Sequence, residues 1–436
     1  MRSELFRVPY EIGGVPLFGY GVLLVLWLVG AGVAYWVSRR RAEKAGTPQP
    51  LSALAWDGVF VAAVAGAIVA LPRLFPAGLP IRAYGVMLVV ASVAGCAMAA
   101  WRARRVGVDP DAIFWLATWL VLSGIAGARL FFVIQFWDVA FPGETLFDRL
   151  RAAAMFTEGG LVVYGGLIVA SVVYVWRCRA EGLPALAVAD LLAPSLAVGL
   201  AIGRIGCLMN GCCYGGLCER PWAVTFPRFH AEGQQYSPPY GDQVARGEMH
   251  GIRLIADPSV GPPRVVVGAV RLDPPPAGLV AGAELVAINS VAIESLDQAQ
   301  AWMLQAYQNR LSVRLRLATG ETVDLPAPEP RERSLPVHPT QVYSAVNAGL
   351  LGWFLWSYYP HRRRDGEVIG LGLTIYPVSR FLIEAIRVDE SAILQTGLTI
   401  SQNVSVLIFV AMAFYWAWIV RAPRVRAFRA EAFDAA

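Results

Sequence analysis

The chain has 436 residues, of which 56% are hydrophobic and 16% charged, and its formal net charge is +5. A mean hydropathy of +0.50 is too high for a soluble protein, and the apolar residues form runs of about 20, the length that crosses a bilayer. Because the excess positive charge comes from basic clusters beside these runs, we exclude nucleic-acid binding. We expect no cleavable signal peptide, since the first apolar run begins near Pro16, is of spanning length and lacks a small-residue cleavage site.

Nine apolar segments predict membrane-spanning helices. They cover about residues 17–37, 55–70, 84–100, 112–134, 161–176, 186–209, 342–359, 368–386 and 401–420. Arginine clusters follow the first, third, fifth, seventh and ninth segments, and such clusters mark the cytoplasmic side. The sequence therefore predicts an all-α polytopic membrane protein with its N-terminus outside and its C-terminus in the cytoplasm.

Polar and apolar stretches divide the chain into four parts. Residues 1–77 form a two-helix membrane unit, residues 78–216 and 337–436 form the two parts of a membrane core, and residues 217–336 form a polar insert rich in proline and glycine. The alternation of basic clusters places this insert outside the membrane.

The insert contains the pattern of a small α+β domain. Residues 265–267 are β-branched, residues 282–289 and 311–317 alternate as half-buried strands, and residues 296–307 form an amphipathic helix. The run from Ala277 to Asn289 resembles a PDZ domain of the bacterial protease-associated type, over about residues 262–328. The resemblance implies binding of an extended peptide at a sheet edge. The alternative is a folded spacer without a ligand.

A polar stretch at the end of the sixth segment, residues 203–216, is the main candidate site. Arg204 lies one step beyond an apolar run, where a charge is costly, and Asn210 with the neighbouring glycines lets the backbone turn sharply. We interpret the stretch as a cationic pocket for a lipid phosphate. The alternative is an arginine that reaches to headgroups at the interface.

Further polar residues gather at the outer ends of other segments. They are Tyr84, Arg129, Tyr164, His338, Gln341, Tyr343, Arg380, Glu384 and Arg387. Arg380 and Glu384 share one helix face and could form an ion pair that locks helix packing. Three separated arginines at similar depth instead suit an anionic headgroup, because guanidinium binds phosphate through two parallel hydrogen bonds.

Four cysteines follow Arg204 with the spacing C-x4-C-C-x4-C, at Cys207, Cys212, Cys213 and Cys218. A structural disulfide is the first expectation in an oxidising compartment. The spacing is not that of a standard zinc site, so we expect no metal and no other cofactor. A thiol that transiently carries a transferred group is a third alternative.

The order of these motifs resembles the prolipoprotein diacylglyceryl transferase family over residues 80–220 and 336–420. The matching pieces are Arg82-Ala83-Tyr84-Gly85, Ala128-Arg129, Tyr164-Gly165-Gly166, Gly203-Arg204-Ile205-Gly206 with Asn210, Gly211 and Gly215, His338-Pro339-Thr340-Gln341-Val342-Tyr343, and Arg380 to Glu384 with Arg387. The resemblance implies transfer of a diacylglyceryl group from phosphatidylglycerol to the lipobox cysteine of a prolipoprotein signal peptide. It implies a site at the outer face of the bacterial inner membrane, where glycerol phosphate is released.

The resemblance also implies roles for the candidate residues. We expect Arg204, Arg380, Glu384 and Tyr164 to be catalytic, and Tyr84, Arg129, Asn210, Gly215, His338, Gln341, Tyr343 and Arg387 to bind substrate. Arg204 and Arg380 would stabilise the leaving phosphate, and Glu384 would orient an arginine or a proton acceptor.

The chain departs from the family pattern at three positions. Tyr164 stands where the family usually has histidine, Cys207 where it has asparagine and Cys212 where it has glutamate. These departures favour an alternative in which the chain is a catalytically altered relative. Such a protein would bind lipid or lipoprotein peptides, or transfer a different group.

Overall fold

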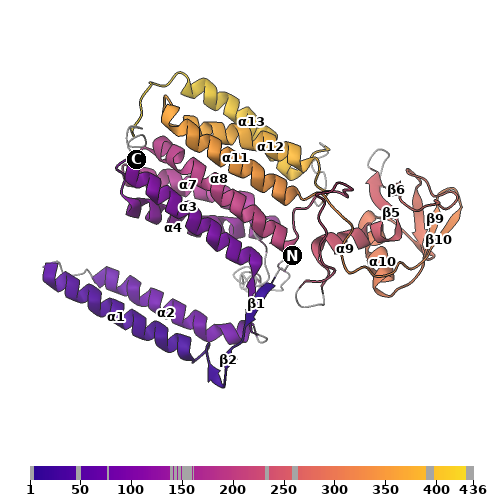
Figure 1. Ribbon diagram of the computed structural model, residues 1–436, viewed down its shortest axis with the longest axis horizontal. Coiled ribbons are helices and arrows are strands. Elements are labelled where there is room, and N and C mark those ends of the chain that lie inside the picture. Colours follow the sequence, from indigo (N-terminus) through magenta and orange to yellow (C-terminus); the bar gives the residue numbers. More distant parts are fainter. Residues whose placement is uncertain are drawn as a thin grey trace. The chain divides into compact units, whose positions relative to one another are not determined.

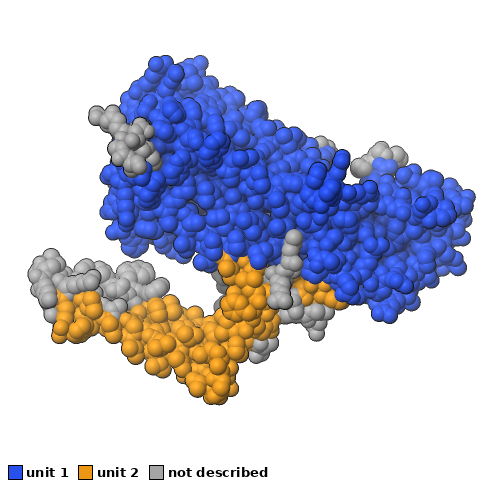
Figure 2. All heavy atoms as spheres, viewed as in Figure 1, with its two compact units in different colours: residues 1, 87–228, 236–436 blue, residues 2–86, 229–235 orange. Residues whose placement is uncertain are grey.

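The computed structural model describes residues 4–45, 51–75, 78–137, 141, 145, 149, 160, 162–230, 235–257, 264–388 and 397–428. The chain divides into two compact units (Figure 2). The smaller unit comprises residues 2–86 and 229–235, and the larger unit comprises residues 1, 87–228 and 236–436.

The smaller unit is a helical hairpin with short strands. Its elements are β1 (Glu4–Val8), β2 (Glu11–Ile12), β3 (Val15–Pro16), α1 (Val22–Ala45), α2 (Leu51–Leu74) and β4 (Leu79–Arg82). The strands pair antiparallel as β1–β4 and β2–β3. The indole nitrogen of Trp27 donates to the carbonyl of Val61 over 3.1 Å, which joins α1 to α2. The two helices run side by side (Figure 1). Both helices lie where the sequence predicted the first two segments.

Within the described residues, seven long helices make up most of the larger unit (Figure 1). They are α3 (Ala83–Arg105, which begins in the smaller unit), α4 (Pro110–Gln135), α7 (Val163–Ala180), α8 (Ala185–Asn210), α11 (Thr340–Tyr358), α12 (Glu367–Glu384) and α13 (Ile400–Ile419), with a short 3-10 turn, η3 (Tyr359–His361), after α11. Helix α4 packs on α7, α8 on α11, and α12 on α13. Leu116, Leu191 and Leu355 lie in the core that joins several of these helices.

Small residues let α4 and α7 approach closely. A Cβ atom on Gly165 would lie 2.3 Å from the Cβ of Phe131, and one on Gly127 would lie 2.7 Å from the Gly165 carbonyl oxygen. Glycine at such a crossing is a recurring device of membrane helix pairs. The contact places the first turn of α7, which carries Tyr164.

Apolar side chains cover the outer faces of the helices. Trp353 on α11 is 70% exposed and Phe414 on α13 is 74% exposed. Among the described residues, four helices are long and apolar enough to cross a membrane, namely α3, α4, α8 and α13. Each of the nine predicted segments coincides with a helix, and membrane spanning by the other five helices stays a prediction.

The insert forms a compact body built from a hairpin, a sheet and two helices (Figure 1). Its elements are α9 (Pro238–Ala245), η2 (Glu248–His250), β5 (Ile252–Asp257), β6 (Arg264–Val270), β7 (Leu285–Ile288), β8 (Val291–Ala292), α10 (Leu296–Gln308), β9 (Val313–Leu317) and β10 (Thr322–Leu325). The sheet order is β10-β9-β7-β8, and β5 pairs with β6. The predicted strands and helix are confirmed between Arg264 and Leu325, whereas α9 and β5 were missed. Residues 258–263, where the predicted domain begins, lie outside the described residues.

Candidate functional site

The end of α8 folds back on itself through two left-handed residues. Gly211 has φ +79°, and the carbonyl oxygen of Cys207 accepts the backbone N–H groups of Gly211 at 2.9 Å and Cys212 at 3.2 Å. Cys213 also has a positive φ, +59°, which is unusual for a residue other than glycine. The two turns return the segment that we call the cysteine loop, residues 211–218, toward the last turn of α8.

Three thiols converge at this turn. The Sγ atoms of Cys207, Cys212 and Cys213 lie within 4.8 Å of one another, and all three side chains are half-buried. All six cysteines of the chain belong to its described parts, and each is a free thiol. The structural disulfide that the sequence favoured is therefore not formed in this structure.

The start of α11 holds the cysteine loop from one side. Thr340 Oγ1 donates to the carbonyl oxygen of Cys213 at 2.5 Å, and Gln341 Nε2 donates to that of Cys212 at 2.7 Å. Gly215 donates its N–H to the His338 carbonyl at 3.0 Å. A Cβ on Gly215 would lie 2.7 Å from that of His338, so this close approach requires glycine.

The end of α12 holds the loop from the other side. Gly216 donates its N–H to the Ile386 carbonyl oxygen at 3.0 Å, and Gly215 pairs with Arg387 in an antiparallel bridge. The loop thus lies between the His338 motif and the charged residues of α12, although both segments follow it in the sequence by more than 100 residues.

Glu384 is the centre of the charged cluster. Its carboxylate is 2% exposed and accepts hydrogen bonds from Arg380, from Arg387 at 3.0 Å and from Thr399 Oγ1 at 3.4 Å. Arg380 also donates to Ser401 Oγ at 3.0 Å. One carboxylate therefore orients two guanidinium groups at the C-terminal end of α12, where they can bind an anion.

Arg204 and Arg387 both lie close enough to Cys213 to act on its charge. Hydrogen bonds from the thiols of Cys207 and Cys212, together with these two positive charges, lower the pKa of the Cys213 thiol. Arg204 also lies beside Tyr376 of α12. The thiol cluster and the arginine cluster thus form one continuous polar site.

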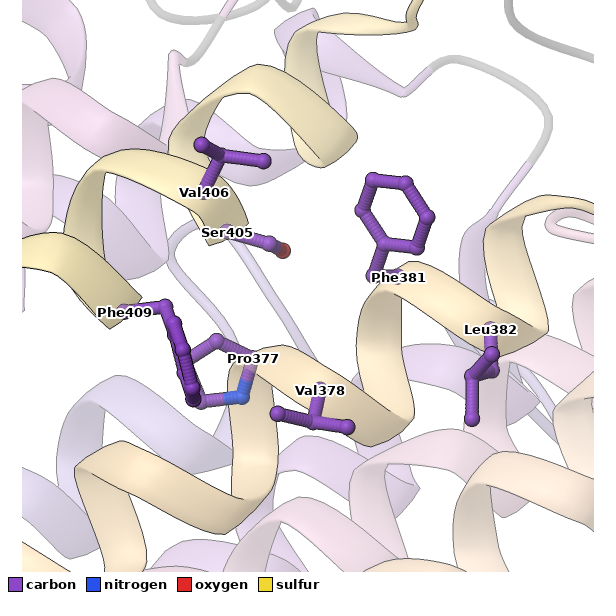
Figure 3. Close-up of a pocket in the computed structure, with 7 residues that line it drawn as sticks. All are labelled: Pro377, Val378, Phe381, Leu382, Ser405, Val406 and Phe409. Atoms are coloured by element: carbon purple, nitrogen blue, oxygen red, sulfur yellow. The ribbon is translucent and has the colours of Figure 1, made fainter.

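An apolar cavity of about 270 Å³ lies between α12 and α13 (Figure 3). Its lining residues are Pro377, Val378, Phe381, Leu382, Ser405, Val406 and Phe409. The hydroxyl of Ser405 donates to the Ser401 carbonyl at 2.7 Å. Phe381 follows Arg380 directly and Ser405 lies one turn beyond Ser401, so the cavity begins about one helical turn below the charged cluster.

Comparison with known proteins decides the family. The family model of prolipoprotein diacylglyceryl transferase matches residues 72–418. The phosphatidylglycerol–prolipoprotein diacylglyceryl transferase of Rhodopirellula baltica is 34% identical over 94% of this chain and 88% of its own length. Enzymes of the same name from Synechococcus elongatus and Mycobacteroides abscessus are each 32% identical, over 34% and 36% of this chain and over 50% and 45% of their own lengths.

The chain belongs to the prolipoprotein diacylglyceryl transferase family. The match includes every candidate residue from Tyr84 to Arg387, and it extends across the insert between α8 and α11. This confirms the resemblance on which the predicted roles rested.

The structure brings most of the predicted residues of this transferase family member together. Arg204, Gly215, Gln341, Arg380, Glu384 and Arg387 share the polar site, and Tyr164 Oη donates to Ser401 Oγ at 3.4 Å. His338 Nδ1 lies 3.2 Å from the hydroxyl of Tyr343, which in turn accepts from Trp222 Nε1 at 2.8 Å. Asn210 is the last residue of α8, directly before the cysteine loop.

Two further predicted residues lie on α3 and α4. Arg129 is buried in α4 and donates to the carbonyl of Gly160 at 3.1 Å. Tyr84 belongs to the smaller unit, at the first turn of α3. Roles for both in binding substrate stay predictions.

Sequence reasoning missed the hydroxyl groups of the site. Thr340 supports the cysteine loop, and Thr399 and Ser401 at the start of α13 contact Glu384 and Arg380. Thr399 forms a capping box with Gln402, a pattern that marks a helix start and could have drawn attention to this segment. The resemblance to the family did not single out Cys213. Its side chain lies near Cys207 and Cys212 in a segment where Cys213 itself has a left-handed backbone conformation.

Proposed function

We propose that the chain transfers a diacylglyceryl group from phosphatidylglycerol to the lipobox cysteine of a prolipoprotein signal peptide. The observation that carries this proposal is the Arg380–Glu384–Arg387 cluster, which lies directly above an apolar cavity between two helices. The arginine cluster suits an anionic head group, and the apolar cavity suits a hydrocarbon chain. A phospholipid carries both groups.

Phosphatidylglycerol would bind with its phosphate at the arginines and an acyl chain in the cavity between α12 and α13. Guanidinium groups bind phosphate oxygens in pairs, and Glu384 holds two of them in place. The cavity is lined by aliphatic and aromatic side chains with Ser405 as its polar member, and this composition suits hydrocarbon.

In the proposed reaction the thiolate sulfur of the peptide attacks the glyceryl carbon that carries the phosphate. The carbon–oxygen bond breaks, and glycerol phosphate leaves with the electron pair. Arg204, Arg380 and Arg387 stabilise the charge that develops on the leaving phosphate, while Glu384 orients Arg380 and Arg387. Tyr164 acts through Ser401, which contacts Arg380.

The site would lie at the outer face of the bacterial inner membrane. All nine long helices would span it, with the N-terminus and the insert in the periplasm and the C-terminus in the cytoplasm. The arginine clusters after alternate helices support this orientation. Labelling of single cysteines placed in the insert tests it, and labelling from the cytoplasmic side would contradict it.

The insert, as a PDZ-like domain, would add an extended peptide to the edge of β5. The first half of this edge is already used, since Ile252 and Leu254 donate their N–H groups to the carbonyls of Gly247 and Arg246. The available part of the edge therefore begins after Leu254, beside the exposed side chain of Ile255. Protection of residues 255–257 from hydrogen exchange by added peptides would support this mode, and unchanged exchange would contradict it.

Transfer by the purified chain in detergent tests the main proposal. The assay supplies phosphatidylglycerol and a lipobox peptide with one cysteine, and follows the peptide mass and the release of glycerol phosphate. A mass gain of one diacylglyceryl unit is expected, and a peptide whose cysteine is replaced by serine serves as control. Peptide that binds without any product would favour the catalytically altered relative, which the side chains at Tyr164, Cys207 and Cys212 suggest.

A further inference from the structure

The three converging thiols take no part in the transfer steps proposed for the arginines, Glu384 and Tyr164. Cys207, Cys212 and Cys213 come from two turns of chain that reverse direction, and the positive φ of Cys213 aims its side chain back toward the others. Backbone strain of this kind is retained where the surrounding structure holds it, and here Thr340 and Gln341 anchor the carbonyls of Cys213 and Cys212.

The geometry of the cluster suits a single metal ion. Three thiolates that hold one Zn²⁺ at about 2.3 Å in a tetrahedral arrangement lie about 3.8 Å from one another. The three Sγ atoms lie within 4.8 Å of one another, so small rotations of the side chains bring them to that separation. A disulfide would use two of these sulfurs and leave the third beside it.

The charge around the cluster also suits a metal bound by thiolates. Zinc with three thiolates carries one net negative charge, and a fourth thiolate raises this to two. The guanidinium groups of Arg204 and Arg387 act on Cys213, and Arg204 also acts on Cys207, so both lie where they offset this charge. Within the described residues, no fourth histidine, cysteine or carboxylate joins the group, which leaves one tetrahedral position open.

We propose that Cys207, Cys212 and Cys213 bind one Zn²⁺ ion whose fourth position takes the thiol of the acceptor peptide. Three protein ligands with an open position are the pattern of catalytic rather than structural zinc. This inference rests on the proposed function, because it assigns a means of activating the nucleophile in that reaction.

Zinc would remove the need for a general base at the thiol. The described candidates for a base are already engaged: Glu384 accepts from two arginines, and His338 Nδ1 contacts the hydroxyl of Tyr343. The hydroxyl of Tyr164 donates to Ser401 Oγ at 3.4 Å. A thiol that coordinates zinc is deprotonated outright, so the nucleophile forms without any of them.

The step balances without an oxidant or reductant. The peptide thiol releases its proton to water as its sulfur binds zinc. That sulfur then forms a bond to the glyceryl carbon, the carbon–oxygen bond to phosphate breaks, and glycerol phosphate leaves with the electron pair. The product thioether binds zinc more weakly than a thiolate does, so the open position is freed for the next peptide.

Metal content and cobalt spectroscopy of the full chain in detergent test the site. Protein loaded with Zn²⁺ and desalted is expected to hold one zinc per chain, and Co²⁺ in its place is expected to give sulfur-to-cobalt charge-transfer absorption. The variants Cys207→Ser, Cys212→Ser and Cys213→Ser should each weaken metal binding more than about 100-fold. Mutating a group that only contacts a ligand typically weakens metal binding by about 10- to 100-fold, so a larger loss indicates a direct ligand. Cys218→Ala, in the same loop but outside the cluster, is the matched control and should bind metal as the native chain does.

The acceptor peptide provides a second readout. A lipobox peptide with cysteine should intensify and shift the cobalt absorption, whereas the same peptide with serine should leave it unchanged. Zinc removed from the native chain by a chelator should abolish transfer, and added Zn²⁺ should restore it. This arm changes no residue, so it decides the matter even if a serine variant fails to fold.

The outcomes separate this inference from the proposed function. Full transfer by metal-free protein, or equal metal binding by the native chain and the three serine variants, would overturn the zinc site and leave the transferase proposal standing. One metal per chain and a cobalt response to the cysteine peptide, without any transfer, would support the zinc–thiolate site and overturn the proposed transfer.

Discussion

Gln341 Nε2 donates a hydrogen bond to the carbonyl oxygen of Cys212 over 2.7 Å, and this contact ties the cysteine loop to the start of α11. The side chain of Gln341 is fully buried, and its replacement leaves the half-buried Cys212 without this donor to its carbonyl. We expect Gln341→Ala to lower the free energy of unfolding by about 1–3 kcal/mol. Transfer should fall more than about ten-fold, since a site displaced by a fraction of an ångström loses much of its rate.

Asn347→Ala is the matched control for this variant. Asn347 lies on the same helix and donates from Nδ2 to Ser379 Oγ at 2.9 Å, away from the cysteine loop. It should lower the melting temperature while the transfer rate per folded molecule stays near native. Equal losses of rate in both variants would mean that Gln341 acts on stability alone.

Glu384→Gln tests the negative charge at the centre of the arginine cluster, because it replaces the carboxylate by a neutral amide of nearly the same size. The carboxylate is buried and accepts from both Arg380 and Arg387, so a neutral amide leaves two guanidinium groups without this counter-charge. We expect the free energy of unfolding to fall by about 3 kcal/mol, the scale for breaking a buried ion pair. Transfer should fall about 100-fold or more, because the donors at the leaving phosphate lose their orientation.

Glu367→Gln at the opposite end of α12 tests whether any lost ion pair has this effect. Glu367 is also buried, and its Oε1 lies 3.5 Å from Arg364 Nη1. This variant should lose stability and keep its rate. Native transfer by Glu384→Gln, measured as product per folded molecule, would remove Glu384 from the site.

Tyr164 and Ser401 distinguish positioning from acid–base chemistry. The hydroxyl of Tyr164 donates to Ser401 Oγ at 3.4 Å, and Ser401 also accepts from Arg380 at 3.0 Å. If Tyr164 acts through Ser401, Tyr164→Phe removes one neutral hydrogen bond and should slow transfer about ten-fold at most. Ser401→Ala, which removes the acceptor of Arg380, should then cost more. A loss of about 100-fold or greater in Tyr164→Phe with a smaller loss in Ser401→Ala would instead make Tyr164 a proton-transfer group.

The sequence predicted the helices and most of the site, because both depend on local patterns. Apolar runs of spanning length and arginine clusters located every long helix that the structure describes, and residue types at helix ends singled out Arg204, Arg380 and Glu384. Contacts between distant segments could not be predicted in this way. The backbone carbonyls of Cys212 and Cys213 are bonded by side chains more than 120 residues later, and no periodicity in the sequence records such a pairing. The disulfide expectation failed for the same reason, since cysteine spacing does not show that three thiols meet at one point.

The insert should lose stability in mild acid because of His250. This side chain is 4% exposed and lies beside Tyr307, and burial lowers its pKa from 6.5 to about 4. The unfolded chain takes up the proton near pH 6.5, while the folded chain does so only near pH 4. Between these values the unfolded state binds more protons, so the free energy of unfolding falls as the pH falls. The expected loss from pH 7 to pH 5 is about 2 kcal/mol.

Hydrogen exchange of the full chain, followed in residues 247–254 at pH 7 and pH 5, measures this effect after correction for the intrinsic rate. His250→Phe removes the titrating group and fits beside the aromatic ring of Tyr307, so it should keep the same protection at both values. Burial raises the pKa of the neighbouring Glu248, so the folded state binds this proton more tightly than the unfolded state does. As the pH falls, Glu248 therefore raises the free energy of unfolding and opposes the loss that His250 causes. Equal protection of the native insert at pH 7 and pH 5 would show that His250 is not the group that titrates.

At the other end of the membrane core, the side chain of Asp190 on α8 caps the N-terminus of α12, although the two helices are far apart in the sequence. Its Oδ2 and Oδ1 atoms accept the N–H groups of Gly366 at 2.7 Å and Ile369 at 2.8 Å, and Arg362 Nε lies 3.8 Å from Oδ2. The side chains of both Asp190 and Arg362 are fully buried. The carboxylate thus satisfies amides at a helix N-terminus and neutralises a buried guanidinium at the same time.

Asp190→Asn should therefore destabilise the chain strongly while the polar site around Glu384 keeps its chemistry. The amide replaces one acceptor oxygen by a donor and leaves Arg362 without its nearest buried counter-charge, for an expected loss of about 3–5 kcal/mol. Asp109→Asn is the matched control: Asp109 is an exposed N-cap of α4 that accepts from Asp111 N at 3.0 Å, and asparagine caps a helix equally well. The melting temperature in detergent should thus fall clearly for Asp190→Asn and stay at the native value for Asp109→Asn. Transfer per folded molecule should be unchanged in both variants. Equal melting temperatures for the two variants would mean that the Asp190–Arg362 pair adds nothing to the stability of the bundle.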